Sequence, residues 1–497
     1  MSDPTVGVAE RQVDLAVVGA GPAGLSAAVV AAENGLTVAL VDASPQAGGQ
    51  YWRHPDERHL DSYARPESTG HHHWPHFRDL RTRLSRAVDA GRVLHLAGRQ
   101  VWQVLRPEGA PFALRMTPTA GRDASAPADR VVHADRLVIA TGAYDRQLPV
   151  PGWTLPGVMA AGGVQALYKA NQVVAGRRAV VAGTGPFLLS VAAGLADAGV
   201  EVVAVCEANA LSRWAATPLR ATQEPGKLLE GVGYARTFLR DRIPYRTRTI
   251  VTEVRGRGRA ESVVTARVDG AGRVRPGTER ELEADLVAFG WGFTPQLELA
   301  VNLGLDTRID VDESLVVRVD DAQRTSLPGV YAAGETTGIG GAVQSCAEGE
   351  LAALTAVADA AATAPAERSR RLARRIRRGR RFAIGMHRAS PVPRAWSDWV
   401  RPDTIVCRCE EVDAAAIAET VTGLDADDPR DVRVTARPGM GWCQGRVCGF
   451  AVSKLTAEHS GCAWTREQLE PLQKRPIGVP LRLSDVAELD IEGRITP

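Results

Sequence analysis

The chain has 497 residues, 44% of them hydrophobic and 24% charged, which is ordinary for globular protein and long enough for about three domains. Its 60 basic and 58 acidic side chains leave a net charge of +2, so no overall field favours nucleic acid or a membrane surface as a partner. No apolar run reaches the roughly 18 residues of a transmembrane segment, no secretion signal is visible, and seven cysteines argue against a disulfide framework. A cytoplasmic, multidomain protein is therefore expected.

A glycine-rich turn lies close to the N-terminus. From residue 13 the sequence predicts a buried parallel strand, a turn and a helix, with Gly19, Gly21 and Gly24 in the G-x-G-x-x-G spacing. These glycines allow, in order, a tight turn, the approach of a pyrophosphate and close helix–strand packing. Pro22 and Ala23 begin the helix, whose N-terminus favours phosphate. The next strand ends on Asp42, which is suited to the adenosine ribose hydroxyls, so a dinucleotide site is predicted.

Four histidines, His71, His72, His73 and His76, lie in an insertion over residues 53–77. Three consecutive histidines cannot share one face of a regular element. An exposed polar loop is therefore expected instead of a preformed metal site. A histidine that carries protons near a cofactor stays open as an alternative.

Further segments follow the first turn in a fixed order. They are the turn containing Gly49 and Gln50, the strand that ends in Thr141 and Gly142, and the segment that ends in Gly334 and Glu335, after which a helix begins near Ala342. Together they resemble the flavoproteins with two dinucleotide-binding domains, the group that contains thioredoxin reductase and glutathione reductase. The resemblance implies FAD at the first site. It also implies that the segment at Glu335, where the family usually has Asp, contacts the ribityl and phosphate portion of the flavin, and that the helix from Ala342 faces its ring.

A second strand–turn–helix begins near residue 178. Gly183 and Gly185 are in place, but Leu188 replaces the third glycine, so this helix is expected to lie further from its strand. The following strand ends on Glu207, an acid that favours NAD over its 2′-phosphorylated form. Two alternatives stay open: a working NAD(H) site, and a vestigial site that is empty or holds another adenine nucleotide.

No C-x-x-C pair occurs in the sequence, and Cys206 and Cys346 are isolated. Disulfide reductases of this kind need such a dithiol, so that reaction is excluded.

Nine arginines lie between Arg368 and Arg381, with Leu372 and Ile376 forming a narrow apolar seam. A solvated helix that links two domains is preferred here over a docking surface for an acidic partner or nucleic acid.

Four of the seven cysteines gather near the C-terminus. Cys407 and Cys409 form a C-x-C pair, and Cys443 and Cys448 form a C-x4-C pair. Two ligands on one tight turn point the same way, and both Fe–S clusters and zinc accept four thiolates. The surrounding sequence resembles the [2Fe-2S] module named after bacterioferritin-associated ferredoxin, in the form fused to flavoproteins of the opine oxidase, hydrogen cyanide synthase and hydroxyproline dehydrogenase type. A [2Fe-2S] cluster is thus preferred over zinc, with Cys462 outside the ligand set.

The expected fold is α/β with two Rossmann-like domains and a small α-helical [2Fe-2S] domain. An FAD domain would comprise residues 10–150 and 290–365, with an NAD(P)-like domain inserted over 151–289. A basic linker helix (366–402), the cluster domain (403–465) and a C-terminal tail (466–497) would follow.

The resemblance implies an electron-transfer subunit of a heteromeric amino-acid, opine or imino-acid dehydrogenase or oxidase. A partner flavoprotein subunit would oxidise the C–N bond, and a small third subunit is left open. No acid–base pair or nucleophile stands out as catalytic. The alternatives are a stand-alone NAD(P)H-dependent oxidoreductase and a redox-sensing docking protein.

Overall fold

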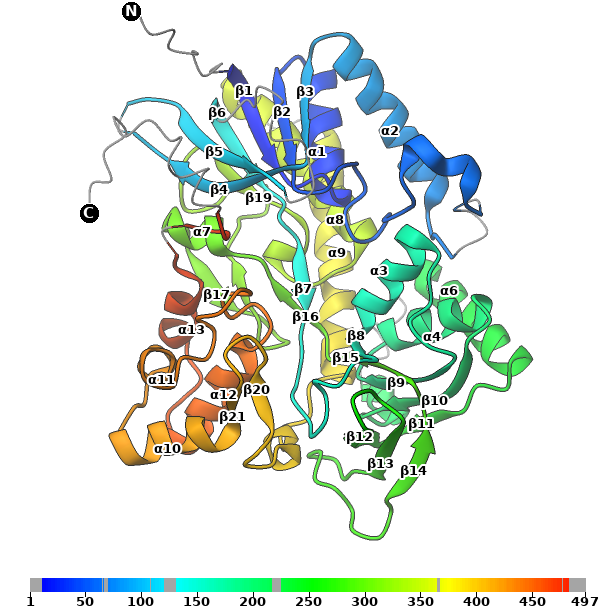
Figure 1. Cartoon of the computed structure of the whole chain (residues 1–497). Coiled ribbons are helices and arrows are strands. Elements are labelled where there is room, and N and C mark those ends of the chain that lie inside the picture. The colour runs from blue at the N-terminus through cyan, green and yellow to red at the C-terminus, as the bar shows by residue number, and fades with distance from the viewer. Residues whose placement is uncertain are drawn as a thin grey trace, which may run out of the picture.

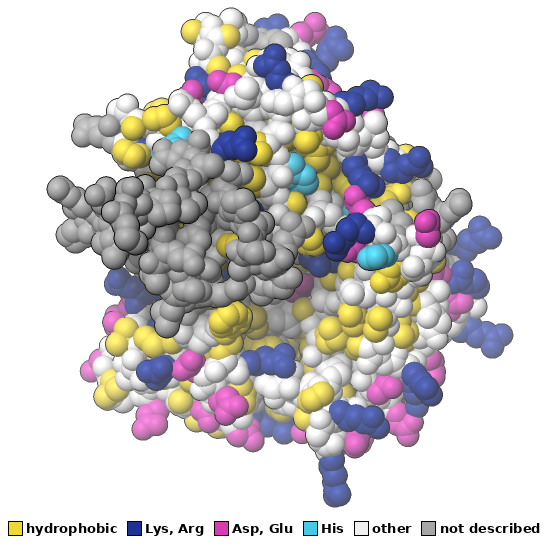
Figure 2. Space-filling model, turned by 45° about the horizontal axis from the view of Figure 1, so that its top comes forward, with side chains coloured by type: hydrophobic (Ala, Val, Ile, Leu, Met, Phe, Trp, Pro, Cys, Tyr) yellow, Lys and Arg dark blue, Asp and Glu magenta, His cyan; other side chains and the backbone are white. Residues whose placement is uncertain are grey.

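Two parallel sheets, each carrying one glycine-rich turn, organise the chain (Figure 1). The structure is a computed structural model that describes residues 11–64, 66, 70–107, 109–119, 131–216, 225–363, 367–475 and 477–481. In Figure 1 the first sheet lies at the top, the second at the lower right and the cysteine-bearing helices at the lower left. Figure 2 shows basic and acidic side chains interspersed over one face, as the net charge of +2 leads one to expect.

The first sheet has the strand order β3-β2-β1-β6-β5-β4, with β19 also paired to β6. β1 is parallel to β2 and β6, and Val18 is level with both Val41 and Ile139, so these strands end at one edge. Helices α1, α2 and α8 pack on one face around a shared apolar core. The bounds are β1 (Arg11–Val18), α1 (Pro22–Glu33), β2 (Val38–Asp42), α2 (Trp74–Asp89), β3 (Val93–Ala97), β4 (Arg99–Leu105), β5 (Phe112–Pro118), β6 (Val131–Ile139), β19 (Val330–Ala332) and α8 (Ala342–Ala360).

The second sheet is entirely parallel, in the order β11-β10-β9-β15-β8. Helices α3 and α4 pack on one face, while the antiparallel sheet β12-β13-β14 packs on the other. The bounds are β8 (Val158–Ala160), α3 (Ala161–Asn171), β9 (Arg178–Gly183), α4 (Phe187–Asp197), β10 (Glu201–Glu207), η3 (Leu211–Ala216), α6 (Pro225–Arg240), β11 (Tyr245–Thr247), β12 (Thr249–Arg255), β13 (Ser262–Arg267), β14 (Arg280–Glu283) and β15 (Leu286–Gly290).

A two-stranded connection joins the two sheets. β7 (Ala143–Asp145) leaves the first sheet, and β16 (Phe293–Pro295) returns antiparallel to it, in the centre of Figure 1. After this crossing come α7 (Glu298–Asn302), the hairpin β17 (Thr307–Ile309) and β18 (Leu315–Val317), and then β19. The FAD-type domain is thus assembled from two separated stretches of the chain.

The arginine-rich stretch forms helix α9 (Glu367–Ala389), which packs along α8. Leu372 and Ile376 are buried against Leu351, so the apolar seam predicted from their spacing is present. The preferred view of a solvated connector is nevertheless wrong for one side of this helix. Gly379 and Ala383 are also buried, because α9 is long enough to pack against a neighbouring helix over several turns.

The cysteine-bearing module consists of short strands and four helices. Asp413 and Asp428 cap α10 and α11 by accepting hydrogen bonds from backbone N–H groups at 2.9 and 2.8 Å. Helix α13 begins with a capping box and packs against α11 and α12. It extends the packed chain beyond the boundary expected at residue 465. The bounds are β20 (Ile405–Cys407), β21 (Val412–Asp413), α10 (Ala414–Leu424), α11 (Pro429–Ala436), α12 (Gly449–Ser460) and α13 (Arg466–Gln473).

The histidine insertion is more buried than the sequence predicted. His71 is 7% exposed, and its ring nitrogens lie 3.0 and 2.7 Å from the carbonyl oxygens of Pro66 and Arg53. Burial lowers the pKa of His71 to about 4. The exposed loop expected here is therefore wrong for this residue, because the insertion folds back so that two of its own backbone carbonyl groups lie against the His71 ring. In the described part of the chain, no helix is long and apolar enough to cross a membrane.

Candidate cofactor sites

The first glycine-rich turn has no room for side chains. Gly19 has φ of +104°, and a Cβ there would overlap the Ala140 carbonyl oxygen. A Cβ on Gly24 would overlap the carbonyl of Gly19, so helix and strand touch directly. Asp42 at the end of β2 accepts a hydrogen bond from the Ala20 N–H at 2.5 Å. The turn and the acid at the neighbouring strand end therefore lie together.

The N-terminus of α1 fits a diphosphate. Gly21 stands at the N-cap with no side-chain cap, so the first-turn N–H groups have no side chain in front of them. A second glycine turn lies alongside, where the Gly48 N–H donates to the Ala20 carbonyl at 2.9 Å. A Cβ on Gly49 would lie 2.7 Å from Gly21 Cα. Gln50 follows at the exposed rim and accepts a hydrogen bond from Arg53 Nε at 3.0 Å.

The segment after β19 meets the same turn. Gly334 has φ of +82°, and a Cβ there would lie 2.9 Å from Ala23 Cβ. The Glu335 carboxylate accepts hydrogen bonds from the N–H groups of Gly340 and Gly341 at 3.2 and 2.8 Å, just before α8 begins at Ala342. Burial raises the pKa of the Glu335 carboxyl to about 7. The sequence motifs from three separate segments are thus brought together.

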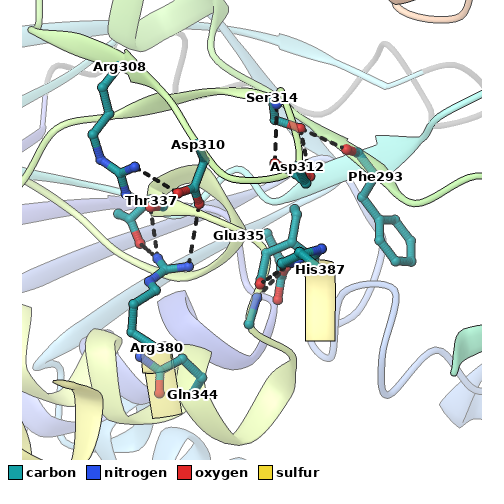
Figure 3. Close-up of polar contacts among 12 residues, drawn as sticks. Phe293, Arg308, Asp310, Asp312, Ser314, Glu335, Thr337, Gln344, Arg380 and His387 are labelled. Atoms are coloured by element: carbon teal, nitrogen blue, oxygen red, sulfur yellow. Dashed lines mark hydrogen bonds and ion pairs between the residues drawn. The ribbon is translucent and has the colours of Figure 1, made fainter. Parts of the chain in front are cut away.

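Side chains of helix α9 contact the segment that follows β19 (Figure 3). Arg380 Nη2 donates to the Thr337 carbonyl at 2.8 Å. The guanidinium also lies 3.8 Å from the buried Glu348 carboxylate. Glu348 accepts hydrogen bonds from the Gly334 N–H and the Thr337 hydroxyl at 2.9 and 2.8 Å. His387 lies 3.0 Å from the Ile339 carbonyl. These contacts hold the loop that would border the flavin.

The sequence reasoning missed these supporting residues. One signal was available: Arg380 stands four residues after Ile376 and three before Ala383, so it shares their inward face. No comparable signal identifies Glu348.

The strand end at Thr141 and Gly142 is bound to the crossing strand. The Thr141 hydroxyl donates to the Gln296 carbonyl at 2.7 Å, and the Gln296 N–H donates to the Gly142 carbonyl at 2.9 Å. The crossing strand is thereby fixed to the site.

The second glycine-rich turn has a different environment. Gly183 has φ of +146°, and a Cβ there would overlap the Gly290 carbonyl. Leu188 is fully buried and packs against Gly290, a position without a side chain. Glu207 is 3% exposed, and its carboxylate accepts hydrogen bonds from the Gly185 N–H at 2.8 Å and the Thr184 hydroxyl at 3.1 Å. Burial raises the pKa of Glu207.

The four C-terminal cysteines lie next to one another. Interaction with the Cys448 side chain lowers the pKa of Cys407 to about 6 and of Cys443 to about 5. Cys409 also contacts Cys443 and is exposed. Among the described residues, no three His, Cys, Asp or Glu side chains are arranged around a point for one metal ion.

Glycines surround these sulfurs. The Gly439 N–H donates to Cys407 Sγ at 3.3 Å, and a Cβ on Gly441 would overlap Cys409 Cβ. Gly439 and Gly445 both have φ of +78° and lie against each other. The chain therefore wraps the thiols closely with backbone, and one backbone N–H reaches a sulfur.

An ionic network joins the cysteine module to the first domain. Arg446, between Cys443 and Cys448, lies 2.7 Å from the Glu298 carboxylate of α7. Arg475 lies 3.3 Å from the same oxygen. Tyr144 of β7 lies over Arg446, 5.7 Å from ring centroid to guanidinium. Burial raises the pKa of Tyr144 to about 12.

Two arginines beside the cysteines, Arg446 and Arg408, differ in their contacts. Arg446 is paired with a carboxylate of the first domain. The Arg408 guanidinium instead stacks on Trp153 of the second domain at 5.3 Å.

Comparisons with known proteins agree with this geometry. A family model for pyridine nucleotide-disulphide oxidoreductases matches residues 13–353. An opine oxidase subunit of Agrobacterium tumefaciens is 32% identical, over 96% of this chain and 92% of that protein. Hydrogen cyanide synthase subunit HcnB of Pseudomonas aeruginosa is 32% identical, over 90% and 94%. The solved L-proline dehydrogenase from P. horikoshii has a similar fold, with a TM-score of 0.65 at 18% identity, covering 96% of this chain and 79% of that one.

The chain therefore belongs to the pyridine nucleotide-disulphide oxidoreductase family and is an FAD-dependent oxidoreductase. The predictions of an α/β flavoprotein fold and of relatives that are enzyme subunits are confirmed. The matched relatives extend over the cysteine module as well as the two dinucleotide-binding domains.

Proposed function

We propose that this chain is the electron-transfer subunit of a heteromeric dehydrogenase or oxidase that acts on an amino acid, an opine or an imino acid. It carries FAD at the first glycine-rich turn and a [2Fe-2S] cluster on Cys407, Cys409, Cys443 and Cys448. A partner flavoprotein subunit oxidises the C–N bond of the substrate. When bound, FAD exchanges electrons in pairs or singly, whereas the cluster carries one at a time.

The observation that carries the proposal is the position of Arg446. It lies in the loop between two of the cysteines and is ion-paired with Glu298 of the FAD-type domain. The four thiols are therefore fixed against the domain that would hold the flavin. Four cysteines in two close pairs supply the four thiolates that a [2Fe-2S] cluster takes.

The relatives support the remaining part of the proposal. The matched opine oxidase and hydrogen cyanide synthase chains are each one subunit of a larger enzyme, and they match nearly the whole chain. Cys409 at the exposed side of the module gives a route to a second protein.

The metal centre is tested by analysing purified protein for iron, sulfide and zinc. Two irons and two sulfides per chain are expected, together with an axial paramagnetic signal after reduction with dithionite. Cys407→Ser and Cys448→Ser should each lose the iron, while Cys462→Ser, the matched control, should keep it. One zinc per chain without sulfide would contradict the proposed cluster.

The partner is tested by co-expressing the chain with a flavoprotein encoded beside it. The complex, mixed anaerobically with a panel of N-substituted amino acids and imino acids, should lose its visible flavin and cluster absorbance. The isolated chain should not respond. Bleaching of the isolated chain by a substrate would show that the C–N bond is oxidised here and not in a partner.

A further inference from the structure

The C-terminal end of α9 and the two residues that follow it lie at the second glycine-rich turn. A Cβ on Gly185 would lie 3.7 Å from Ser390 Cβ. The Pro391 carbonyl accepts a hydrogen bond from Asn209 Nδ2 at 2.9 Å. The Arg388 carbonyl accepts one from Arg213 Nη2 at 3.3 Å. Residues 388–391 therefore extend from the turn after β9 to the residues that follow β10.

These are the two places that a dinucleotide would occupy. In a fold of this type the pyrophosphate lies over the first strand–helix turn, and the adenosine ribose lies beside the acid at the end of the neighbouring strand. Here the Gly185 N–H donates to Glu207, and Asn209 and Arg213 donate to carbonyls of the chain itself. The turn-to-acid bond has a counterpart at the first site, between Ala20 and Asp42, whereas the bonds from Asn209 and Arg213 tie residues 388–391 across the second site.

The first site shows the contrast. At Gly21, the corresponding glycine, the one close neighbour is Gly49 Cα, which bears no side chain. At Gly185 the neighbour is the side chain of Ser390, followed by the rigid Pro391. The two neighbours lie at similar contact distances, 3.9 and 3.7 Å from the added Cβ, but only the one at the second site carries a side chain.

The crossing segment is held at both ends. On one side, α9 is packed along α8. On the other, the Ala395 N–H donates to the Ala271 carbonyl at 2.9 Å, and Trp399 is buried with its ring centroid 5.4 Å from that of Trp291. Displacing residues 388–391 would therefore disturb contacts on both sides.

We propose that residues 388–391 fill the second dinucleotide site and exclude NAD(H) from it. The residues at this site do not fit the nicotinamide nucleotide that the family implies. The segment thereby determines which electron donors the enzyme accepts, because a nicotinamide cannot be held at this domain. This inference does not depend on the identity of the partner or of the metal centre.

The test is calorimetric titration of the intact, FAD-loaded protein with NADH and with ADP-ribose. The Kd of the wild-type protein for each of the two nucleotides should be above about 1 mM. In the variant Ser390→Gly/Pro391→Gly the residue nearest Gly185 and the proline after it lose their side chains, but Asn209 and Arg213 keep their donors. This variant should bind NADH at least about tenfold more tightly than the wild type. The reason is that residues 388–391 should leave the second site accessible in a larger fraction of the molecules.

Gly185→Val, introduced into that double variant, gives the matched control. It should remove the gained affinity, since a pyrophosphate needs a glycine at this point. Micromolar binding of NADH by the wild-type protein would overturn the proposal. So would an affinity that is unchanged in a double variant that retains its flavin spectrum, or a gain that survives Gly185→Val.

Discussion

Arg446 Nε lies 2.7 Å from Glu298 Oε1, across the boundary between the cysteine module and the FAD-type domain. Glu298 also meets Arg475, and the side chains of the three residues are between 3% and 12% exposed. One buried carboxylate therefore balances two guanidinium groups. Because Arg446 belongs to the C-x4-C loop, the position of two cysteines depends on an acid in another domain.

Replacing Glu298 by Gln should loosen the module. The two guanidinium groups would then be buried without a counter-charge, which costs about 3–5 kcal/mol in comparable cases. We expect the apparent melting temperature to fall by roughly 3–5 °C and trypsin to cleave the module sooner. Differential scanning calorimetry and timed proteolysis provide the measurements.

An exposed ion pair provides the control for Glu298→Gln. Glu283 lies 2.5 Å from Arg178, but its side chain is 79% exposed. Glu283→Gln should change the melting temperature by about 2 °C or less, because exposed pairs contribute little. Equal effects of the two substitutions would show that the Arg446–Glu298 contact does not hold the module in place.

Replacing Arg380 by Ala should weaken FAD binding. The side chain donates to the Thr337 carbonyl and lies beside Glu348, so its loss leaves the loop after β19 without support from α9. Hydrogen bonds of a charged group contribute about 1.5–3 kcal/mol, which corresponds to roughly a 10- to 150-fold higher Kd for FAD. Flavin fluorescence during reconstitution gives the Kd. Arg378→Ala, on the exposed side of the same helix, should leave it unchanged.

Much of the fold was predictable because the signals were local. The glycine spacing around Gly19 and Gly183 identified both strand–turn–helix units, and the strands ending on Asp42 and Glu207 are where the sequence placed them. Such units follow from backbone sterics over some thirty residues. The cysteine spacing likewise brought four thiols together without any knowledge of the surrounding fold.

The missed features depend on contacts between residues far apart in sequence. Arg380 and Thr337 are 43 residues apart, and Asn209 and Pro391 are 182 apart. No periodicity in α9 shows that its C-terminal end reaches the second glycine-rich turn. His71 was expected to be exposed because a polar run gives no hint of the two carbonyl groups that pair with its ring.

The free energy of unfolding of the FAD-free protein should fall as the pH rises from 4.5 to about 7, because the Glu335 carboxyl loses its proton. Its folded-state pKa of about 7 lies above the ordinary value of 4.5, so the folded chain binds more protons than the unfolded chain between these values. The contribution of the protonated Glu335 carboxyl to the free energy of unfolding is therefore fully present below pH 4.5 and is lost as the pH rises to about 7. Glu335→Gln should stabilise the protein relative to wild type at pH 8 by at most about 3 kcal/mol, and much less at pH 5. Urea unfolding of both proteins at each pH measures the difference, and a pH-independent difference would contradict this assignment.

Trp442 should contribute to binding of the partner subunit. Its side chain is 81% exposed although it directly precedes Cys443, and exposed tryptophan is uncommon outside interaction surfaces. Trp442→Ala should leave the melting temperature and iron content unchanged but weaken the complex with the partner flavoprotein roughly 30-fold, as loss of an aromatic anchor of about 2 kcal/mol would. Leu239→Ala on α6 is the matched control, since Leu239 is equally exposed but belongs to the second domain. Analytical ultracentrifugation of the mixed subunits gives both affinities. Equal affinities for the two variants would place the interface elsewhere on the molecule, whereas a loss confined to Trp442→Ala would place the partner at the side of the module where Cys409 is exposed.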